Sequence, residues 1–159
     1  MLRTQRPGGR IDLPTCNPDS GPDTAFVVQL LCAVLELIRI EPRRAARLPA
    51  VVVRGMERFV ARAAGALGEF HTPNHRWVVA SALAQTGALF PKLRHEKMLR
   101  ALLAEGFDLD ADGFYLERSP AIYDAVSNRS LLLLHEFADA PDALSAVERS
   151  LLTDLSPAS

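Results

Sequence analysis

The sequence predicts an all-α protein made of consecutive helical hairpins. Apolar residues recur at helical spacing, as at Val52, Met56, Phe59 and Val60, with arginines on the opposite face. Proline or glycine interrupts the chain between such segments, and each interruption is short. No clear strand is present. Because short breaks make successive helices antiparallel neighbours, the pattern favours hairpins that pack side by side.

The chain divides into an arm and a helical domain. Residues 1–23 are rich in proline and glycine, which predicts an extended or loosely ordered N-terminal arm. Residues 24–155 carry the helical pattern and are expected to form a helical-hairpin domain.

The helix boundaries follow from capping residues and prolines. The first helix should end before Pro42, and Asp23 or Thr24 is placed to cap its start. Pro73 suits the first turn of a later helix, and Ser119-Pro120 suits the start of another, with Ser119 as the cap and Pro120 as the first helical residue. The expected helices are 24–41, 50–70, 74–90, 93–105, 119–137 and 143–155.

Length and composition define the class of protein. The chain has 159 residues, of which 48% are hydrophobic and 23% charged, enough for one domain with a real core. A net charge of -1 argues against a nucleic-acid partner. The longest apolar run, residues 25–40, contains Gln29, Glu36 and Arg39, so no membrane span is expected. The first residues lack the apolar core of a signal peptide, which favours a cytoplasmic protein.

No pattern in the sequence indicates a metal or a cofactor. Cys16 and Cys32 stand alone, without the spacing of a zinc site or a disulfide framework. Residues 108–113 copy the first half of a calcium-binding loop, but Ser119 takes the place of the glutamate needed at the twelfth position. We therefore interpret this segment as an aspartate-rich turn.

Two segments concentrate the polar groups that bind and deprotonate an acidic sugar. Asn74, His75 and Arg76 lie together at the start of a predicted helix, where backbone N–H groups favour anions. The segment 112–129 adds tyrosines and further arginines. The interval between His75 and Tyr123 is long enough for two helix starts to return to the same end of a helical array.

Several members of this group also fit a structural role. Trp77 is either a platform for a sugar ring or, more commonly for an aromatic residue, part of the core. Arg76, Arg118 and Arg129 are either substrate clamps or partners in ion pairs that tie the hairpins together. Tyr115 competes with Tyr123 as the functional phenol.

These two segments resemble the heparinase II/III-like family of polysaccharide lyases, which is similar to some alginate lyases. In that family an Asn-His pair precedes, by about this interval, a tyrosine in a D-G…S-P…Y segment. The corresponding residues here are Asn74-His75, then Asp112-Gly113, Ser119-Pro120 and Tyr123. The resemblance covers roughly residues 23–137.

The resemblance implies a fold and an activity. The fold is an (α/α) toroid of helical hairpins, usually followed by a β-sandwich. This chain is shorter than a complete toroid and shows no β-rich region, so we expect an incomplete toroid that need not be active alone. The activity is β-elimination at the uronic acid residues of an acidic oligosaccharide or polysaccharide.

The resemblance also implies a role for each matching residue. Asn74 and His75 match the positions that neutralise the C6 carboxylate, which stabilises the charge that develops there. Tyr123 matches the tyrosine that protonates the departing O4 and, for one sugar stereochemistry, also removes the C5 proton. For the other stereochemistry, His75 is the base. Arg76, Trp77, Tyr115, Arg118 and Arg129 are the expected substrate-binding residues.

Two other functions remain open from the residues alone. One is a glycoside hydrolase on a hairpin barrel, with Glu117 and Asp124 as its carboxylate pair. The other is a non-catalytic helical module that binds a saccharide or a protein through the same cleft.

Overall fold

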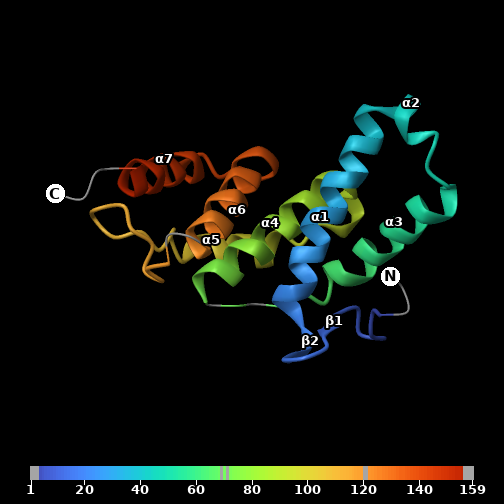
Figure 1. Ribbon diagram of the computed structural model, residues 1–159, viewed down its shortest axis with the longest axis horizontal. Helices are drawn as coiled ribbons and strands as arrows, with labels where there is room; N and C mark the ends of the chain where they lie inside the picture. Colours follow the sequence, from blue (N-terminus) through green and yellow to red (C-terminus); the bar gives the residue numbers. More distant parts are fainter. Residues whose placement is uncertain (1–3, 69, 71, 120–121, 156–159) are drawn as a thin grey trace.

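The computed structural model describes residues 4–68, 70, 72–119 and 122–155, and it is predominantly helical, as predicted (Figure 1). Its elements are β1 (Ile11–Leu13), β2 (Asn17–Ser20), α1 (Gly21–Ile40), α2 (Pro42–Ala45), α3 (Ala50–Ala64), α4 (Pro73–Leu89), the 3-10 turn η1 (Pro91–Leu93), α5 (Glu96–Ala104), α6 (Tyr123–Phe137) and α7 (Asp142–Leu155). Within the described ranges, the helices are too short or too polar to cross a membrane.

The N-terminal segment contains regular structure that the sequence did not predict. β1 and β2 form an antiparallel hairpin in which Ile11 pairs with Ser20, so the expectation of no strands was wrong here. Gln5, which is buried, donates hydrogen bonds from its side chain to the backbone oxygens of Gly9 and Phe59. Contacts with distant residues of α3 therefore order a segment whose local composition favours irregular structure.

Helix α1 begins earlier than its predicted cap. Ser20, rather than Asp23 or Thr24, is the N-cap, and its hydroxyl accepts a hydrogen bond from the backbone N–H of Asp23. Pro22 fits the first turn because it has no N–H to satisfy. Gly21 is required by close packing, since a Cβ there would lie 2.3 Å from the carbonyl oxygen of Leu67.

The other helix boundaries differ most from the predicted ones where a helix adjoins a loop. Helix α3 ends at Ala64 instead of continuing to residue 70, because Gly65 and Gly68 favour termination. Helix α6 begins at Tyr123, although Ser119 was the predicted cap. The carbonyl of Ser119 accepts from the N–H groups of residues 122–124, and Pro120 lies outside the described residues. Helices α4 and α7 match their predicted spans to within one residue at each end.

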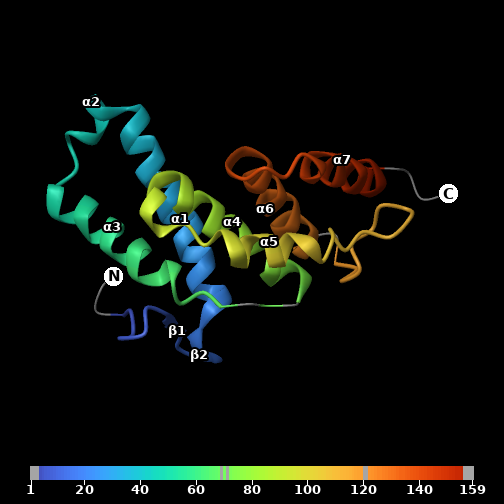
Figure 2. The same ribbon diagram turned by 180° about the vertical axis from the view of Figure 1, so that it is seen from behind.

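Helix α4 runs through the centre of the molecule. Nearly all of its residues are buried, and small residues such as Ala80, Ser81 and Ala82 let its neighbours approach closely. Helices α1 and α3 lie on one side of it and α6 and α7 on the other, and the view from behind shows the same order (Figures 1 and 2). A helix surrounded in this way is buried on all faces, which explains why α4 shows no amphipathic pattern.

A buried polar network joins the three central helices. The side-chain amide of Gln29 on α1 donates to Ser81 Oγ on α4 and, at 3.2 Å, to Ser130 Oγ on α6. The same side chain accepts a hydrogen bond from Arg129 on α6. Buried polar groups that are paired in this way fix the register of the helices against one another.

Candidate functional site

The starts of α4 and α6 lie on the same side of the helical array (Figures 1 and 2). The contact that holds them there is a hydrogen bond of 2.9 Å from the backbone N–H of Asn74 to Glu117 Oε2. Thr72, the N-cap of α4, makes no side-chain capping bond, so Glu117 supplies the missing acceptor from the segment that precedes α6. The negative carboxylate also complements the positive end of the helix dipole.

Three polar side chains at this end lack hydrogen-bond partners among the described residues. Asn74 is 5% exposed, and its Oδ1 is buried without a donor. His75 is half-buried in the first turn of α4, and the Tyr123 side chain is 44% exposed at the first residue of α6. An amide, an imidazole and a phenol are thus left with bonding capacity beside two helix starts.

Arg76 is engaged within the protein. It is 2% exposed, forms ion pairs with Glu105 and Asp108, and donates to the carbonyl oxygen of Gly106 at 2.8 Å. Its guanidinium also lies 4.5 Å from the centre of the Trp77 ring. Of the two roles open from the sequence, these contacts match the ion pair that ties hairpins together. Burial raises the pKa of the Asp108 carboxyl, although the charge of Arg76 opposes that shift.

Trp77 and Tyr115 lie in the core. Trp77 is fully buried and packs against Phe107, with ring centres 5.4 Å apart. Tyr115 is 1% exposed, and its hydroxyl donates to Asn128 Oδ1 at 2.8 Å. These contacts match the packing role for Trp77, and they leave Tyr123 as the more accessible of the two phenols.

Arg118 and Arg129 are exposed, and each has a partner in the protein. Arg118 pairs with Asp110 at 2.7 Å and lies over the ring of Phe114. Arg129 donates to Gln29, as described above. Guanidinium groups have several donors, so these contacts leave further donors that face solvent.

The segment 107–116 forms a tight turn. Asp110 Oδ1 accepts from the backbone N–H groups of Asp112 and Phe114, which is the local bonding that favours aspartate in turns. Leu109 and Tyr115 close the turn with an isolated antiparallel bridge. Across the described ranges, no cluster of three or more histidine, cysteine, aspartate or glutamate side chains has the geometry to hold a metal ion.

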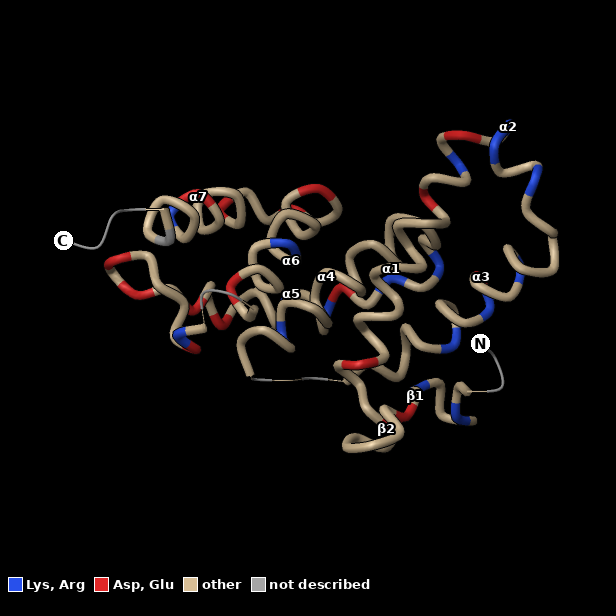
Figure 3. Tube along the Cα trace, viewed as in Figure 1, with Lys and Arg blue, Asp and Glu red and all other residues tan. Residues whose placement is uncertain are grey.

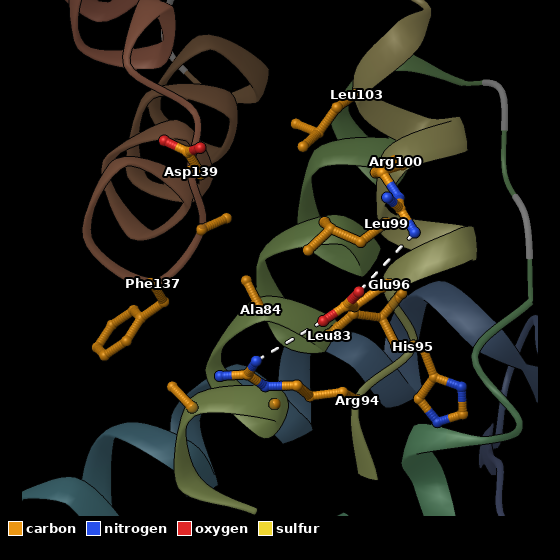
Figure 4. A pocket seen from close by; sticks show the side chains of 13 residues that line it. Leu83, Ala84, Arg94, His95, Glu96, Leu99, Arg100, Leu103, Phe137 and Asp139 are labelled. Atoms are coloured by element: carbon orange, nitrogen blue, oxygen red, sulfur yellow. Dashed lines mark ion pairs between the residues drawn. The ribbon is translucent and has the colours of Figure 1, made fainter. Parts of the chain in front are cut away.

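A separate pocket of about 440 Å³ lies toward the other end of α4 (Figure 4). Its walls include Leu83 and Ala84 of α4 and Leu99 of α5. Arg94 and Arg100 both approach Glu96 there, at 3.6 and 3.8 Å. None of the site residues predicted from the sequence lines this pocket.

Sequence reasoning missed the contacts that assemble this site. Glu117 was considered only as a hydrolase carboxylate, and Glu105 and Asp108 were not considered as partners of Arg76. No local pattern marks such residues, because each acts on a segment far away in the chain.

Comparisons with known proteins found no match to the chain among family models, curated proteins or solved structures.

Proposed function

We propose that the adjoining starts of α4 and α6 form a site for an acidic saccharide, and that its chemistry is β-elimination at a uronic acid. The observation that carries the proposal is Asn74 Oδ1, which is buried yet has no hydrogen-bond partner among the described residues. Leaving a buried polar group unpaired costs free energy, and such groups in native proteins call for an explanation. A sugar hydroxyl would supply the missing donor to this oxygen, and the Nδ2 group of the same side chain has donors for a sugar carboxylate.

The proposed mechanism divides the work among three side chains. The Nδ2 group of Asn74 donates to the C6 carboxylate, while the hydrogen bond from its backbone N–H to Glu117 holds the residue in place. His75 or Tyr123 removes the C5 proton, according to the stereochemistry of the sugar. Tyr123 then donates its proton to O4 as the C4–O4 bond breaks, and a C4–C5 double bond remains.

The resemblance to heparinase II/III-like lyases supports this proposal together with the paired helix starts. The proposal includes the arrangement implied by that resemblance, in which these hairpins are part of an (α/α) toroid. In this proposal, only two of the three predicted substrate-binding arginines contact the sugar. Arg118 and Arg129 retain exposed donors for substrate, whereas Arg76 shapes the site through its ion pairs.

The hydrolase alternative is less favoured by the geometry. Glu117 is occupied as the hydrogen-bond acceptor at the start of α4, and Asp124 is only 2% exposed. A glycosidase needs one carboxyl group that reaches the leaving oxygen and another on the opposite side of the sugar.

Ultraviolet absorbance distinguishes these functions directly, because elimination creates a double bond conjugated to the carboxylate. Incubation with a panel of polyuronates should produce this chromophore, and Tyr123→Phe or His75→Ala should abolish it while circular dichroism stays unchanged. Cleavage without a chromophore that is lost in Glu117→Gln would establish the hydrolase instead.

A binding measurement covers the case in which the chain does not turn over alone. Titration calorimetry with a short uronate oligosaccharide should show binding that Asn74→Ala weakens by about tenfold, the value of one hydrogen bond to a charged group. Equal binding by Asn74→Ala and by the unmodified protein would contradict the proposal.

A further inference from the structure

Helix α3 presents a row of arginines to solvent. Arg54, Arg58 and Arg62 are four residues apart, so they lie on one face of the helix and are separated by about 6 Å along its axis. All three are exposed. The opposite face of α3 carries Met56 and Phe59, which are buried in the core.

Further exposed arginines precede α3 in the chain. Arg43, Arg44 and Arg47 are also exposed, and Glu57 is the only acidic residue from Pro42 to Gly68. We call the set Arg43, Arg44, Arg47, Arg54, Arg58 and Arg62 the arginine surface. Figure 3 shows these positions as blue segments that follow one another along α2 and α3.

The charges of the arginine surface are largely uncompensated. Among the described residues, the single ion pair it makes is the exposed contact of Arg44 with Glu41, at 3.8 Å. Arg62 donates to the carbonyl oxygens of Arg6 and Pro7 and keeps its full charge. Residues 104–155 have the opposite character, because Arg118, Arg129 and Arg149 are their only cations among many carboxylates. Figure 3 shows the resulting separation of charge.

We propose that the arginine surface is a second contact surface for an acidic polysaccharide, separate from the starts of α4 and α6. The choice of an acidic polysaccharide as the polymer rests on the proposed function. Planar guanidinium groups form paired hydrogen bonds with carboxylate and sulfate groups, and every cation on this surface is an arginine. A regular row of them matches a polymer that repeats its negative charge along its length.

Two other polyanions fit the surface less well. A membrane-bound helix buries its apolar face in lipid, but Met56, Phe59 and Val60 of α3 are packed against the protein, and its exposed Val51 and Val52 lie in the first turn. Proteins that bind single-stranded nucleic acids stack the bases on aromatic side chains, and the only aromatic residue of α3, Phe59, is 1% exposed.

The test uses the double variant Arg54→Gln/Arg58→Gln. Arg62 is left in place because it also holds the N-terminal segment through backbone oxygens. The matched control is Lys97→Gln/Arg100→Gln on α5, which removes the same charge from two other exposed residues. Fluorescence anisotropy of a labelled long polyuronate gives the dissociation constant of each protein at several salt concentrations.

The test variant should bind the long polymer about tenfold more weakly. By analogy with phosphate contacts, a plot of log affinity against log salt concentration should have a slope that is shallower by about one unit for each arginine removed. The control should bind like the unmodified protein. Equal binding by the test variant and the unmodified protein, or an equal loss in the control, would overturn the proposal. So would tighter binding of duplex DNA or of anionic lipid vesicles than of the polyuronate at the same salt concentration.

A short uronate oligosaccharide separates this proposal from the proposed function. Its binding should be lost in His75→Ala and unchanged in Arg54→Gln/Arg58→Gln, because it is too short to occupy both surfaces. If His75→Ala has no effect on the oligosaccharide while the arginine variant still weakens polymer binding, the proposed function fails and the arginine surface stands.

Discussion

Tyr115 and Tyr123 occupy opposite environments although both belong to the same segment of the chain. Tyr115 is 1% exposed and donates to Asn128, whose own amide nitrogen donates to Ser150 at 3.3 Å. Tyr123 is 44% exposed, and its hydroxyl has no hydrogen-bond partner among the described residues. Burial and pairing therefore indicate that the Tyr115 hydroxyl stabilises the fold, whereas the Tyr123 hydroxyl is available to a ligand.

Removal of each hydroxyl group tests this division. Tyr115→Phe should lower the free energy of unfolding by about 1–2 kcal/mol, because it leaves the buried Asn128 oxygen without its donor. Tyr123→Phe should change it by less than about 0.5 kcal/mol, as for other exposed sites. Urea unfolding followed by circular dichroism measures both, and a larger loss in Tyr123→Phe would contradict the assignment.

The two cysteines should differ in reactivity. Cys16 is exposed, whereas Cys32 is buried beside Thr86, and burial raises the pKa of the Cys32 thiol to about 11. Since the thiolate is the reactive form, the folded protein at pH 8 should consume one equivalent of a thiol reagent rapidly. Cys16→Ser should remove this fast phase, and denaturation should expose Cys32. A fast phase that persists in Cys16→Ser would contradict the prediction.

At the scale of elements, Arg76 joins the start of α4 to the loop that follows α5. Both carboxylates that it contacts, on Glu105 and Asp108, lie beyond the end of α5. The guanidinium is nearly inaccessible to water, so its charge depends on these partners. This pairing brings the 105–118 loop, which carries Glu117, against the first turn of α4.

Arg76→Met should lower the free energy of unfolding by about 3 kcal/mol or more at pH 7, because it leaves the two carboxylates without their cation. Adding Asp108→Asn to this variant should restore part of the loss. The deficit in unfolding free energy of Arg76→Met, relative to the unmodified protein, should also shrink as the pH falls. Burial raises the pKa of Asp108, so the folded variant takes up a proton there at a higher pH than the unfolded chain does. A deficit that grows toward acidic pH would contradict this account.

At the scale of the whole molecule, the buried helix α4 and the side chain of Gln29 hold the hairpins together. Gln29 contacts α4 through Ser81 and α6 through Ser130 and Arg129. Its two partner helices are far apart in sequence, so this single side chain joins segments that otherwise meet mainly through apolar packing and a few polar contacts, such as the bond from Arg39 to the carbonyl oxygen of Leu89. Apolar packing alone tolerates small shifts of register, whereas paired polar groups do not.

Gln29→Leu should therefore destabilise the protein by about 1–3 kcal/mol, because the buried hydroxyl of Ser130 loses its partner. The neighbouring Leu30 is 58% exposed and provides the control. Leu30→Gln should change the free energy of unfolding by no more than about 0.5 kcal/mol. Thermal unfolding of both variants gives the comparison, and equal effects would contradict a structural role for the network.

The helices could be predicted because their signals are local. Apolar spacing and the positions of Pro42, Pro73 and Pro91 act within a few residues, so α4 was located to within one residue at each end. The β1–β2 hairpin was missed because it depends on contacts with distant residues, such as the bond from Gln5 to Phe59. Helix α6 begins at Tyr123, later than the predicted cap at Ser119.

The sequence by itself determined that this protein is mostly helical and that polar groups gather near Asn74 and Tyr123. Only the tertiary structure decided which of those groups remain available. It buried Arg76, Trp77 and Tyr115 among partners, whereas the side chains of His75 and Tyr123 have no hydrogen-bond partner in the described part of the chain. The physical reason is that helix formation depends on neighbouring residues, whereas burial and ion pairing depend on which remote segments the folded chain brings together.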